Sequence, residues 1–219
     1  MSAWFITGTD TGVGKTLVTA ALLQAFAGTG KRVVGMKPVA AGLDAEGCNE
    51  DVELLCAASN VAAERRLVNP YAFAAPVAPH LAAAEEGRDI RFAPIHAALG
   101  ELRRQAEVVL VEGVGGFRVP LGPEGDAADL AQTLNLPVIL VVGLRLGCIN
   151  HALLTVEAIA ARGLKLAGWV GNHIDPDMLR QAENVRALTG LIEAPLLGVL
   201  PFMAPPDPAH AAKLLSLPA

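Results

Sequence analysis

Short apolar runs alternate with longer helix-periodic segments along most of this 219-residue chain, and this alternation is the feature that most restricts its fold. The runs are rich in β-branched residues and are bounded by glycine or proline, which is typical of buried strands. Strands of a parallel sheet covered by helices read as continuous apolar runs of this kind. We therefore predict strands at residues 4–7, 32–37, 108–111, 138–142, 166–170 and 196–200.

Between these runs, apolar residues recur at helical spacing. We predict helices at residues 15–27, 94–105, 127–134, 151–161 and 178–188, with a short helix inside 77–87 and another after a proline-rich turn at 204–208. Strands that alternate with helices form parallel sheets through right-handed crossovers. The predicted fold is therefore α/β, one domain spanning residues 1–219, with a mostly parallel sheet flanked by helices on both faces.

Composition and charge exclude several functional classes. A formal net charge of −5 gives no basic surface for nucleic acid or an anionic membrane. The longest apolar run, residues 138–144, is far shorter than the about 20 residues that a membrane span needs. The N-terminus lacks the pattern of a secretory signal, and the three cysteines have no CxxC spacing. We expect a cytoplasmic protein with reduced cysteines, no nucleic-acid partner and no membrane partner.

The segment from Gly8 to Thr16, GTDTGVGKT, carries the strongest chemical signal in the chain. It follows a predicted strand and opens a predicted helix, which is the context of a P-loop. Glycines let backbone N–H groups surround phosphate oxygens, and the helix N-terminus adds partial positive charge. Lys15 is expected to reach the β- and γ-phosphates, and the Thr16 hydroxyl to bind Mg²⁺. The chain is thus predicted to have a P-loop NTPase fold.

The spacing of this loop differs from the standard pattern, because five residues rather than four separate Gly8 from Gly14. A glycine turn that only links a strand to a helix is the alternative.

Two acidic residues are candidates for holding Mg²⁺, which prefers carboxylate and phosphate oxygens. Glu112 ends the predicted strand 108–111 and precedes a glycine-rich turn, where a metal-binding acid of this fold belongs. Asp51 lies at a predicted helix start. The alternatives are a solvent-facing strand-end acid for Glu112 and an ordinary first-turn acid for Asp51.

A second lysine, Lys37, ends the predicted strand 32–37, immediately before Pro38. A lysine at the carboxyl end of a strand can face a ligand site and stabilise developing negative charge. It can equally point to water, and the sequence alone does not choose between these positions.

These residues together resemble the dethiobiotin synthetase family over nearly the whole chain. The most specific block is LGCINH at residues 146–151. Further matching blocks, in the same order as in the family, are residues 8–16, 37–40, 69–71, 79–80, 111–116, 137–142, 167–170 with Asn172, and 195–200.

The resemblance implies an ATP-dependent cyclo-ligase that forms C–N bonds. Its substrates are 7,8-diaminopelargonate, CO₂ or bicarbonate, and ATP, its cofactor is Mg²⁺, and it works as a homodimer with its sites near the subunit interface. One amine of the diamine forms a carbamate, ATP phosphorylates that carbamate, and the neighbouring amine closes the ureido ring to give dethiobiotin, ADP and phosphate.

The resemblance also assigns roles to individual positions. It implies Lys37 and Lys15 as catalytic residues and Thr16, Asp51 and Glu112 as metal ligands. It implies ATP contacts at Gly12, Val13, Gly14, Lys15, Thr16, Leu17, Asp51, Glu112, Gly113, Val114, Gly115, Asn172, His173, Pro201, Phe202 and Met203, of which the last five form the adenine pocket. It implies diamine contacts at Thr11, Lys37, Ala41, Gly115 and Asn150, the last of these from the partner subunit.

The chain departs from the family pattern at a few of these positions. Gly12 stands where the family often has an acidic residue, and Ala41 where it often has a serine that contacts the substrate. Losing that hydroxyl removes a hydrogen bond worth about 0.5–1.5 kcal/mol. Asn184 stands near the place where some members have a tyrosine against the carboxylate tail of the substrate.

Two other functions compete with this prediction. A P-loop switch ATPase of the partitioning or iron-protein class shares the GKT loop and a similar sheet, but many members carry a lysine near the loop start, where this chain has Gly8 and Thr9. A non-catalytic nucleotide-binding module would not need the combination of Lys37 with two carboxylates. Dependence of phosphate release on the diamine and bicarbonate discriminates among the three.

Overall fold

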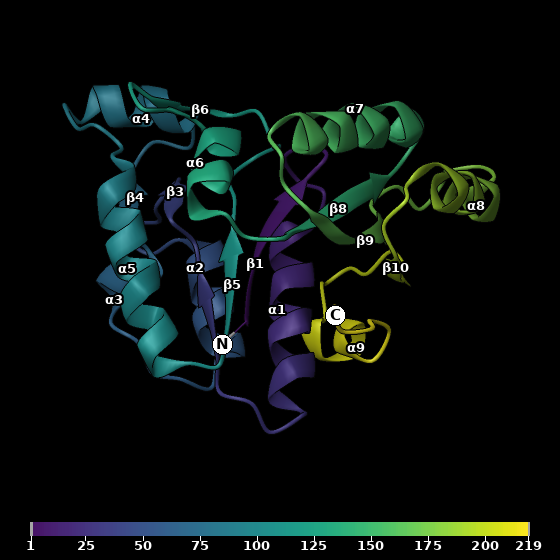
Figure 1. Ribbon diagram of the computed structural model, residues 1–219, viewed down its shortest axis with the longest axis horizontal. Coiled ribbons are helices and arrows are strands. Elements are labelled where there is room, and N and C mark those ends of the chain that lie inside the picture. The colour runs from purple at the N-terminus through teal and green to yellow at the C-terminus, as the bar shows by residue number, and fades with distance from the viewer. Residues whose placement is uncertain (1, 219) are drawn as a thin grey trace.

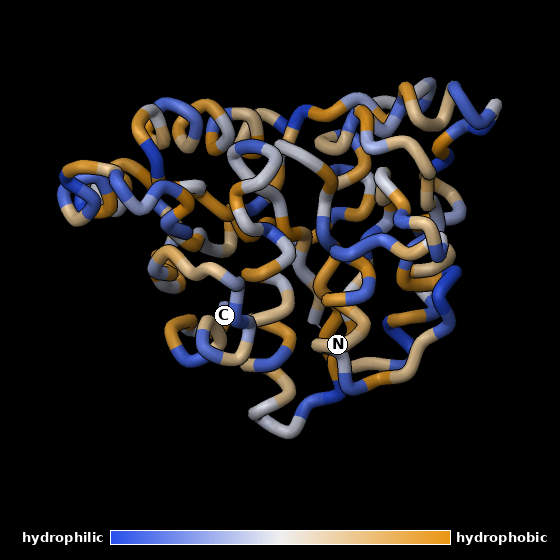
Figure 2. Tube along the Cα trace, turned by 180° about the vertical axis from the view of Figure 1, so that it is seen from behind, coloured by the Kyte–Doolittle hydropathy of each residue, from blue (hydrophilic) through white to orange (hydrophobic). Residues whose placement is uncertain are grey.

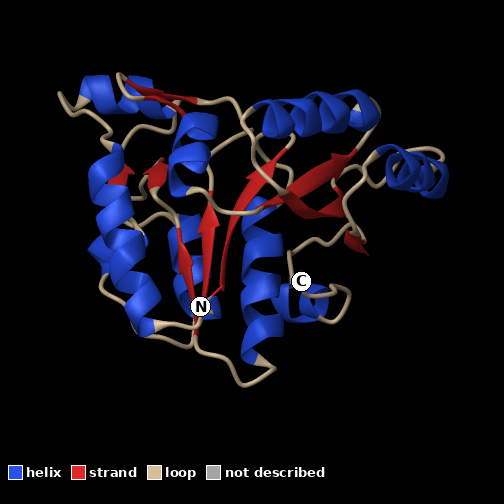
Figure 3. Cartoon of the chain, viewed as in Figure 1, coloured by secondary structure: helices blue, strands red, loops and turns tan. Residues whose placement is uncertain are grey.

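The computed structural model describes residues 2–218. Its central feature is a six-stranded parallel sheet in the order β10-β9-β8-β1-β5-β2 (Figures 1 and 3). The predicted α/β architecture is confirmed, and every predicted strand is present. The strands are β1 (Ser2–Gly8), β2 (Val33–Met36), β5 (Val108–Glu112), β8 (Val138–Leu144), β9 (Leu166–His173) and β10 (Leu196–Leu200).

Helices cover both faces of the sheet, as predicted. The helices α1 (Lys15–Ala27), α2 (Glu50–Ala58) and α9 (Pro208–Ala212) contribute to the apolar core on one face. The helices α5 (Phe92–Gln105) and α6 (Ala127–Leu134) contribute to the core on the other face. The helices α7 (Cys148–Ala161) and α8 (Gln181–Leu191) enclose a third cluster at the β8–β9 end.

The strand β5 shows why its sequence is apolar without alternation. Val108 and Leu110 pack toward α1, whereas Val109 and Val111 pack toward α5, and all four are buried. Successive side chains of a strand point to opposite faces, so a strand covered on both faces needs apolar residues at every position. Glu112 ends this strand and is therefore carried to the edge of the sheet where β1 also ends (Figure 1).

Several short elements lie between the main ones. They are α3 (Arg65–Val68), α4 (Pro79–Glu85), β3 (Val39–Ala41), β4 (Tyr71–Phe73), β6 (Pro120–Gly122) and β7 (Gly125–Asp126). The strands β3 and β4 pair in parallel, and β6 and β7 form an antiparallel pair. The sequence predicted α4 but none of the short strands, because two or three residues are too few to show a period.

Three helix starts differ from the prediction. The helix α5 begins at Phe92, two residues before the predicted start. The other two differences have a backbone cause. The helix α7 begins at Cys148 rather than at residue 151, because Gly147, with φ of 93°, turns the chain directly into the helix. The helix α8 begins at Gln181 rather than at residue 178, because Arg180 adopts a left-handed conformation with φ of 58°.

Apolar side chains also reach the surface near α7 and α8. Leu146 is 91% exposed, Leu154 is 57% exposed and Leu179 is 84% exposed. Figure 2 shows hydrophobic segments in orange along α8 at the edge of the molecule. Among residues 2–218, no helix combines the length and apolar character needed to traverse a bilayer.

Candidate nucleotide-binding and catalytic site

The turn between β1 and α1 has the conformation of a glycine-dependent loop. Gly12 and Gly14 have φ of 72° and 87°, a region that residues with a Cβ atom rarely adopt. A Cβ at Gly14 would lie 2.1 Å from Nδ2 of Asn172, which donates a hydrogen bond to the backbone oxygen of Val13 at 2.9 Å. The loop is therefore shaped both by its own glycines and by the end of β9 behind it.

Lys15 begins α1 and is only 6% exposed. Its Nζ donates a hydrogen bond to the backbone oxygen of Asp10 at 2.9 Å, across the turn. Burial and the nearby Lys37 ammonium lower the pKa of Lys15 from 10.5 to about 8. An anion placed in the loop would relieve this destabilisation, because it favours the charged form of the lysine.

A buried acid–base cluster lies next to the loop. Nζ of Lys37 donates hydrogen bonds to Oε1 of Glu112 at 2.5 Å and to Oδ2 of Asp51 at 2.8 Å. The Thr16 hydroxyl lies 2.7 Å from Oδ1 of Asp51 and 2.9 Å from Oε1 of Glu112. We call these four residues the acid–base cluster.

The sheet order explains how these distant residues meet. The strands β2 and β5 are neighbours, so Lys37, just after β2, comes beside Glu112 at the end of β5. Asp51 lies in the first turn of α2, whose N-cap is Asn49. Lys37 is 3% exposed and Glu112 is 0% exposed, so neither is the solvent-facing residue that the sequence left open as an alternative.

The charges within the acid–base cluster shift each other's protonation. Burial alone would lower the pKa of Lys37, but the carboxylates of Glu112 and Asp51 outweigh it and raise that pKa. Burial alone would raise the pKa of Asp51, but Lys37 and the Thr16 hydrogen bond outweigh it and lower that pKa. Lys37 is therefore an ammonium group and Asp51 a carboxylate at neutral pH.

The cluster offers the oxygen ligands that Mg²⁺ prefers. Thr16 and Asp51 line a cleft, and Oε1 of Glu112 adjoins them. Oε2 of Glu112 is buried and has no hydrogen-bond partner among the described residues. A buried carboxylate with one unpartnered oxygen, adjacent to a hydroxyl and a second carboxylate, is the kind of group that a divalent cation satisfies. The residues present thus fit the predicted metal.

A cleft of about 820 Å³ joins the phosphate loop to the acid–base cluster. Its lining includes both predicted catalytic lysines and most of the predicted loop and substrate positions. Of the positions predicted as ATP, metal or diamine contacts, the cleft lining contains Thr11, Gly12, Gly14, Lys15, Thr16, Leu17, Lys37, Ala41, Asp51, Val114 and Gly115.

Other predicted positions lie outside this lining. Val13 and Asn172 are buried behind the loop, and Gly113 is buried beside Glu112. Asn150 is exposed on α7, and the adenine candidates Pro201 and Phe202 are exposed beyond β10, while His173 and Met203 are partly buried. Burial lowers the pKa of His173, so its ring favours the neutral form. The roles of these positions stay predictions.

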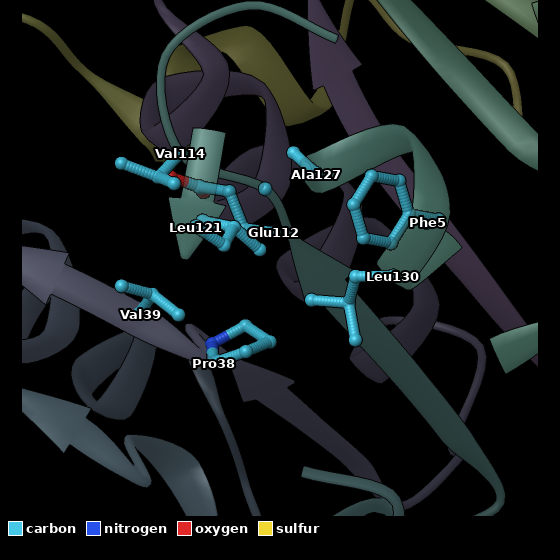
Figure 4. A pocket seen from close by; sticks show the side chains of 9 residues that line it. Phe5, Pro38, Val39, Glu112, Val114, Leu121, Ala127 and Leu130 are labelled. Carbon is cyan, nitrogen blue, oxygen red and sulfur yellow. The ribbon is translucent and has the colours of Figure 1, made fainter. Parts of the chain in front are cut away.

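A cavity of about 10 Å³ lies on the inner side of Glu112. A volume near this size corresponds to about one water molecule. Figure 4 shows that apolar side chains surround it. Glu112 is therefore backed by a nearly dry wall, whose members include Phe5, Pro38, Val39, Leu121, Ala127 and Leu130.

Several parts of the cleft lining were not among the site residues predicted from the sequence, and three of them are informative. These three are Asn49, the segment 76–79 that leads into α4, and Arg118 with its neighbours Val119 and Pro120; the other unpredicted residues are Ala40, Glu50, Leu54 and Pro206. Asn49 precedes two acidic residues at a helix start, which is an N-cap signal. No local signal points to Arg118, because its place depends on how the segment after β5 packs.

Comparison with known proteins shows the family. The AAA domain family model matches residues 2–209. The ATP-dependent dethiobiotin synthetase of Aromatoleum aromaticum is 61% identical over 99% of this chain and 97% of its own length. That of Nitrosospira multiformis is 56% identical over 97% of this chain and 92% of its own length. The chain belongs to the ATP-dependent dethiobiotin synthetase family.

Solved structures with the same fold come from more distant proteins. The MinD cell division protein of Aquifex aeolicus superposes with a TM-score of 0.55 at 16% identity and covers 96% of this chain and 85% of its own. MinD of Pyrococcus horikoshii complexed with Mg-ADP gives 0.55 at 16% identity, covering 99% of this chain and 87% of its own. These similarities support the P-loop fold, whereas membership of the dethiobiotin synthetase family supports the synthetase prediction over a MinD-like switch.

Proposed function

We propose that this protein is an ATP-dependent dethiobiotin synthetase that acts on 7,8-diaminopelargonate and CO₂. The observation that carries the proposal is that Lys37 sits between Glu112 and Asp51 in the cleft that also contains Lys15 and the phosphate loop. A carbamate and a γ-phosphate are both anionic and repel each other. Two ammonium groups in one partly dry cleft reduce that repulsion and hold the reacting groups together.

The proposed reaction has three steps. One amine of the substrate attacks CO₂ and loses a proton, which gives a carbamate. A carbamate oxygen attacks the γ-phosphorus of ATP and the bond to ADP breaks, which gives a carbamic–phosphoric mixed anhydride. The neighbouring amine attacks the carbonyl carbon and loses a proton, inorganic phosphate leaves, and the ureido ring closes.

The two lysines take different parts in these steps. Lys15, at the start of α1, holds the β- and γ-phosphates together with the backbone N–H groups of the loop. Lys37 faces the same cleft from the end of β2 and stabilises negative charge on the carbamate and on the transferring phosphoryl group. The raised pKa of Lys37 keeps it charged for this role.

Thr16, Asp51 and Glu112 are proposed to hold Mg²⁺ when it is bound. The ion supplies charge neutralisation for the phosphate oxygens. The chain itself holds the Asp51 and Glu112 carboxylates in place through the Thr16 hydroxyl and Lys37, and the apolar wall behind Glu112 keeps bulk water away from that side.

The remaining contacts belong to the same proposal. ATP contacts Gly12–Leu17 and Glu112–Gly115, with the adenine near Asn172, His173 and Pro201–Met203. The diamine contacts Thr11, Lys37, Ala41 and Gly115, and Asn150 reaches it from the partner subunit of a homodimer. We also propose that the protein is a single domain and that it works in the cytoplasm.

Replacing Lys37 tests the proposal directly. Loss of one charge-stabilising donor lowers turnover by about 10²–10³-fold, so Lys37→Ala should nearly abolish phosphate release while ATP still binds. Lys165→Ala is the matched control, because Lys165 is exposed and outside the cleft. A coupled phosphate-release assay with diamine and bicarbonate measures both variants.

The same assay separates the alternatives. A synthetase releases phosphate only when both the diamine and bicarbonate are present. Phosphate release that does not depend on the diamine would favour the switch ATPase. Unchanged turnover in Lys37→Ala would contradict the role proposed for that lysine.

A further inference from the structure

We propose that Asn49 is a positioning residue that holds Asp51 in place for Mg²⁺, because it ties the start of α2 to the end of β3. The inference rests on the proposed function, since it concerns a proposed metal ligand of that same site. Both oxygens of the Asp51 carboxylate are engaged, with Oδ1 2.7 Å from the Thr16 hydroxyl and Oδ2 2.8 Å from Nζ of Lys37. The backbone that carries Asp51 therefore has to be placed accurately relative to both neighbours.

Asp51 lies where a helix is held least firmly by its own backbone. It occupies the first turn of α2, whose leading N–H groups have no partner within the helix. The chain that enters this turn is exposed at residues 44–47, and the buried side chains of α2 begin only at Val52. The side chain of Asp51 is itself 43% exposed. A contact outside the helix is consequently needed to fix the carboxylate.

Asn49 makes such a contact, because it uses both ends of its side-chain amide. Oδ1 accepts a hydrogen bond from the N–H of Val52 at 3.3 Å, which caps the helix. Nδ2 donates to the backbone oxygen of Gly42 at 2.9 Å, seven residues earlier in the chain. Capping uses only the oxygen, so serine or aspartate would serve at this position if capping were all that was needed. The amide nitrogen adds a link between α2 and the segment after β3.

The backbone at Gly42 is a fixed point for this link. Its N–H donates to the backbone oxygen of Phe73 at 3.0 Å and so continues the pairing of β3 with β4. The exposed turn that follows is closed on itself, because Oδ1 of Asp44 accepts from the N–H of Cys48 at 2.7 Å. Asn49 therefore joins the first turn of α2 to the β3–β4 pair, and this link bypasses the exposed turn.

The same link supports the ion pair that Asp51 makes. Lys37 lies just before β3 and Gly42 directly follows β3, so both belong to one stretch of backbone. The ion pair with Asp51 and the hydrogen bond from Asn49 thus connect this stretch to α2 at two points. Asn49 also lines the cleft beside Asp51. Side chains that orient a metal ligand without touching the ion typically account for about 10–100-fold in metal affinity or activity.

Binding of ADP, measured by isothermal titration at a series of Mg²⁺ concentrations, tests the assignment without turnover. The dependence of ADP affinity on Mg²⁺ gives the apparent Mg²⁺ affinity of each variant. We expect Asn49→Ala to lower this affinity by about tenfold, the low end of the range for residues that orient metal ligands. The affinity for ADP without Mg²⁺ should stay unchanged. The measurement needs no diamine, so failure of the synthetase reaction and failure of this assignment would appear in different experiments.

Two variants separate positioning from helix stability. Asn49→Ser keeps a capping oxygen but lacks the amide donor to Gly42, so it should unfold near the wild-type temperature and still show most of the loss in Mg²⁺ affinity. Ser59→Ala removes hydrogen bonds at the opposite end of α2, where the hydroxyl accepts from the N–H of Gly35 at 2.9 Å and donates to the backbone oxygen of Leu55 at 2.7 Å. Ser59 lies outside the cleft lining, so this variant should lower the unfolding temperature and leave Mg²⁺ affinity unchanged.

A double-mutant cycle with Asp51→Asn shows whether Asn49 acts through Asp51. A residue that only positions Asp51 has nothing left to position once the carboxylate is gone. Adding Asn49→Ala to Asp51→Asn should therefore change Mg²⁺ affinity by no more than about twofold. A further loss as large as in the wild-type background would show that Asn49 contacts the ion or the nucleotide directly, and would overturn the positioning role.

Other results would also overturn the assignment. One is unchanged Mg²⁺ affinity in Asn49→Ala. Another is full recovery of that affinity in Asn49→Ser, because capping alone would then suffice. An equal loss in Ser59→Ala would attribute the effect to a weakened helix. Wild-type ADP binding that does not depend on Mg²⁺ would contradict the proposed metal site, and the role of Asn49 with it.

Discussion

The two ends of the central sheet differ in which side chains they bury and which they expose. At the β2–β5 end, Lys37 and Glu112 are almost fully buried, and the charges of the acid–base cluster face one another within one chain. At the β8–β10 end, where α7 and α8 lie (Figure 1), Leu146, Leu154 and Leu179 are more than half exposed. The first region gathers charged groups in the interior, and the second exposes apolar side chains to solvent.

One chain provides the whole acid–base cluster, whereas a second chain is predicted to cover the exposed leucines. Removing charges from water costs free energy that even close pairing only partly recovers, so the buried pair of Lys37 and Glu112 is better explained by chemistry than by stability. The exposed leucines lie on α7 and α8 or just before them, and α7 also carries Asn150, the residue predicted to reach the site of a partner subunit. The predicted homodimer would cover this surface.

The largest effect is expected from the most buried acid. Glu112→Gln removes a predicted metal ligand and the main partner of Lys37, and should lower turnover by about 10²–10³-fold. Asp51→Asn should cost less, about 10-fold, because the Asp51 side chain is 43% exposed and water can replace part of its role. Phosphate release measured against Mg²⁺ concentration checks both variants. Equal losses in the two variants would show that burial does not set their importance.

A clash behind the phosphate loop should have the next largest effect. Gly14→Ala forces a Cβ against Asn172 at a φ of 87°, and should destabilise the fold by about 1–3 kcal/mol and weaken ATP binding. Gly12→Ala is the control, because Gly12 also has positive φ but no atom near its Cβ position. Thermal unfolding and nucleotide titration measure both. Adding Asn172→Ala should recover part of the loss, and no recovery would contradict the clash.

The protonation of Lys15 predicts a pH dependence of ATP binding. Its pKa of about 8 in the free protein lies below the 10.5 of an unperturbed lysine, so it loses its proton as pH rises above about 8. Phosphate binds the charged form, so ATP affinity should fall with rising pH by at most about tenfold per unit. Isothermal titration between pH 7 and about 9.5 measures this.

An arginine at the same position is the control for this prediction. Lys15→Arg stays charged throughout this range and should flatten the pH profile even if it binds ATP more weakly. Rising pH has the opposite effect on folding stability: it weakens ATP binding but stabilises the folded protein. Since the unfolded lysine holds its proton more tightly, Lys15 lowers stability below pH 8, and this penalty disappears as pH rises from about 8 toward 10.5.

The smallest effect on the single chain is expected at the exposed leucines. Leu154→Glu should change the free energy of unfolding by no more than about 0.5 kcal/mol, yet shift the protein from dimer to monomer. Leu81→Glu on α4 is the matched control, because Leu81 is 50% exposed and lies far from α7 in the fold (Figure 1). Light scattering distinguishes the two variants, and a dimer that survives Leu154→Glu would place the interface elsewhere.

Local sequence signals were sufficient for the sheet and the phosphate loop, and insufficient for the acid–base cluster. The six main strands and the loop are specified by residues that lie next to one another, such as the glycines before Lys15 and the apolar run before Glu112. Whether Lys37 faces the site depends on β2 lying beside β5, which is a long-range pairing. The prediction that Lys37 is catalytic therefore came from the family resemblance and not from the spacing of residues.

Arg118 illustrates what neither local pattern nor resemblance supplied. It follows the glycine turn after β5 without any periodic context, and only the packing of Phe117 and Leu121 brings it to the cleft. The short strands β3 and β4 were also not predicted, because three-residue strands that contain alanine show no alternating pattern.

Product analysis with isotopically labelled bicarbonate tests the central claim most directly, which is that one cleft joins the diamine, CO₂ and the γ-phosphate. We expect the wild-type protein to incorporate the label into a cyclic urea in amounts equal to the phosphate released, and Lys37→Ala to do neither while still binding ATP. Phosphate release without label in a cyclic product, or labelled product from Lys37→Ala at the wild-type rate, would contradict it.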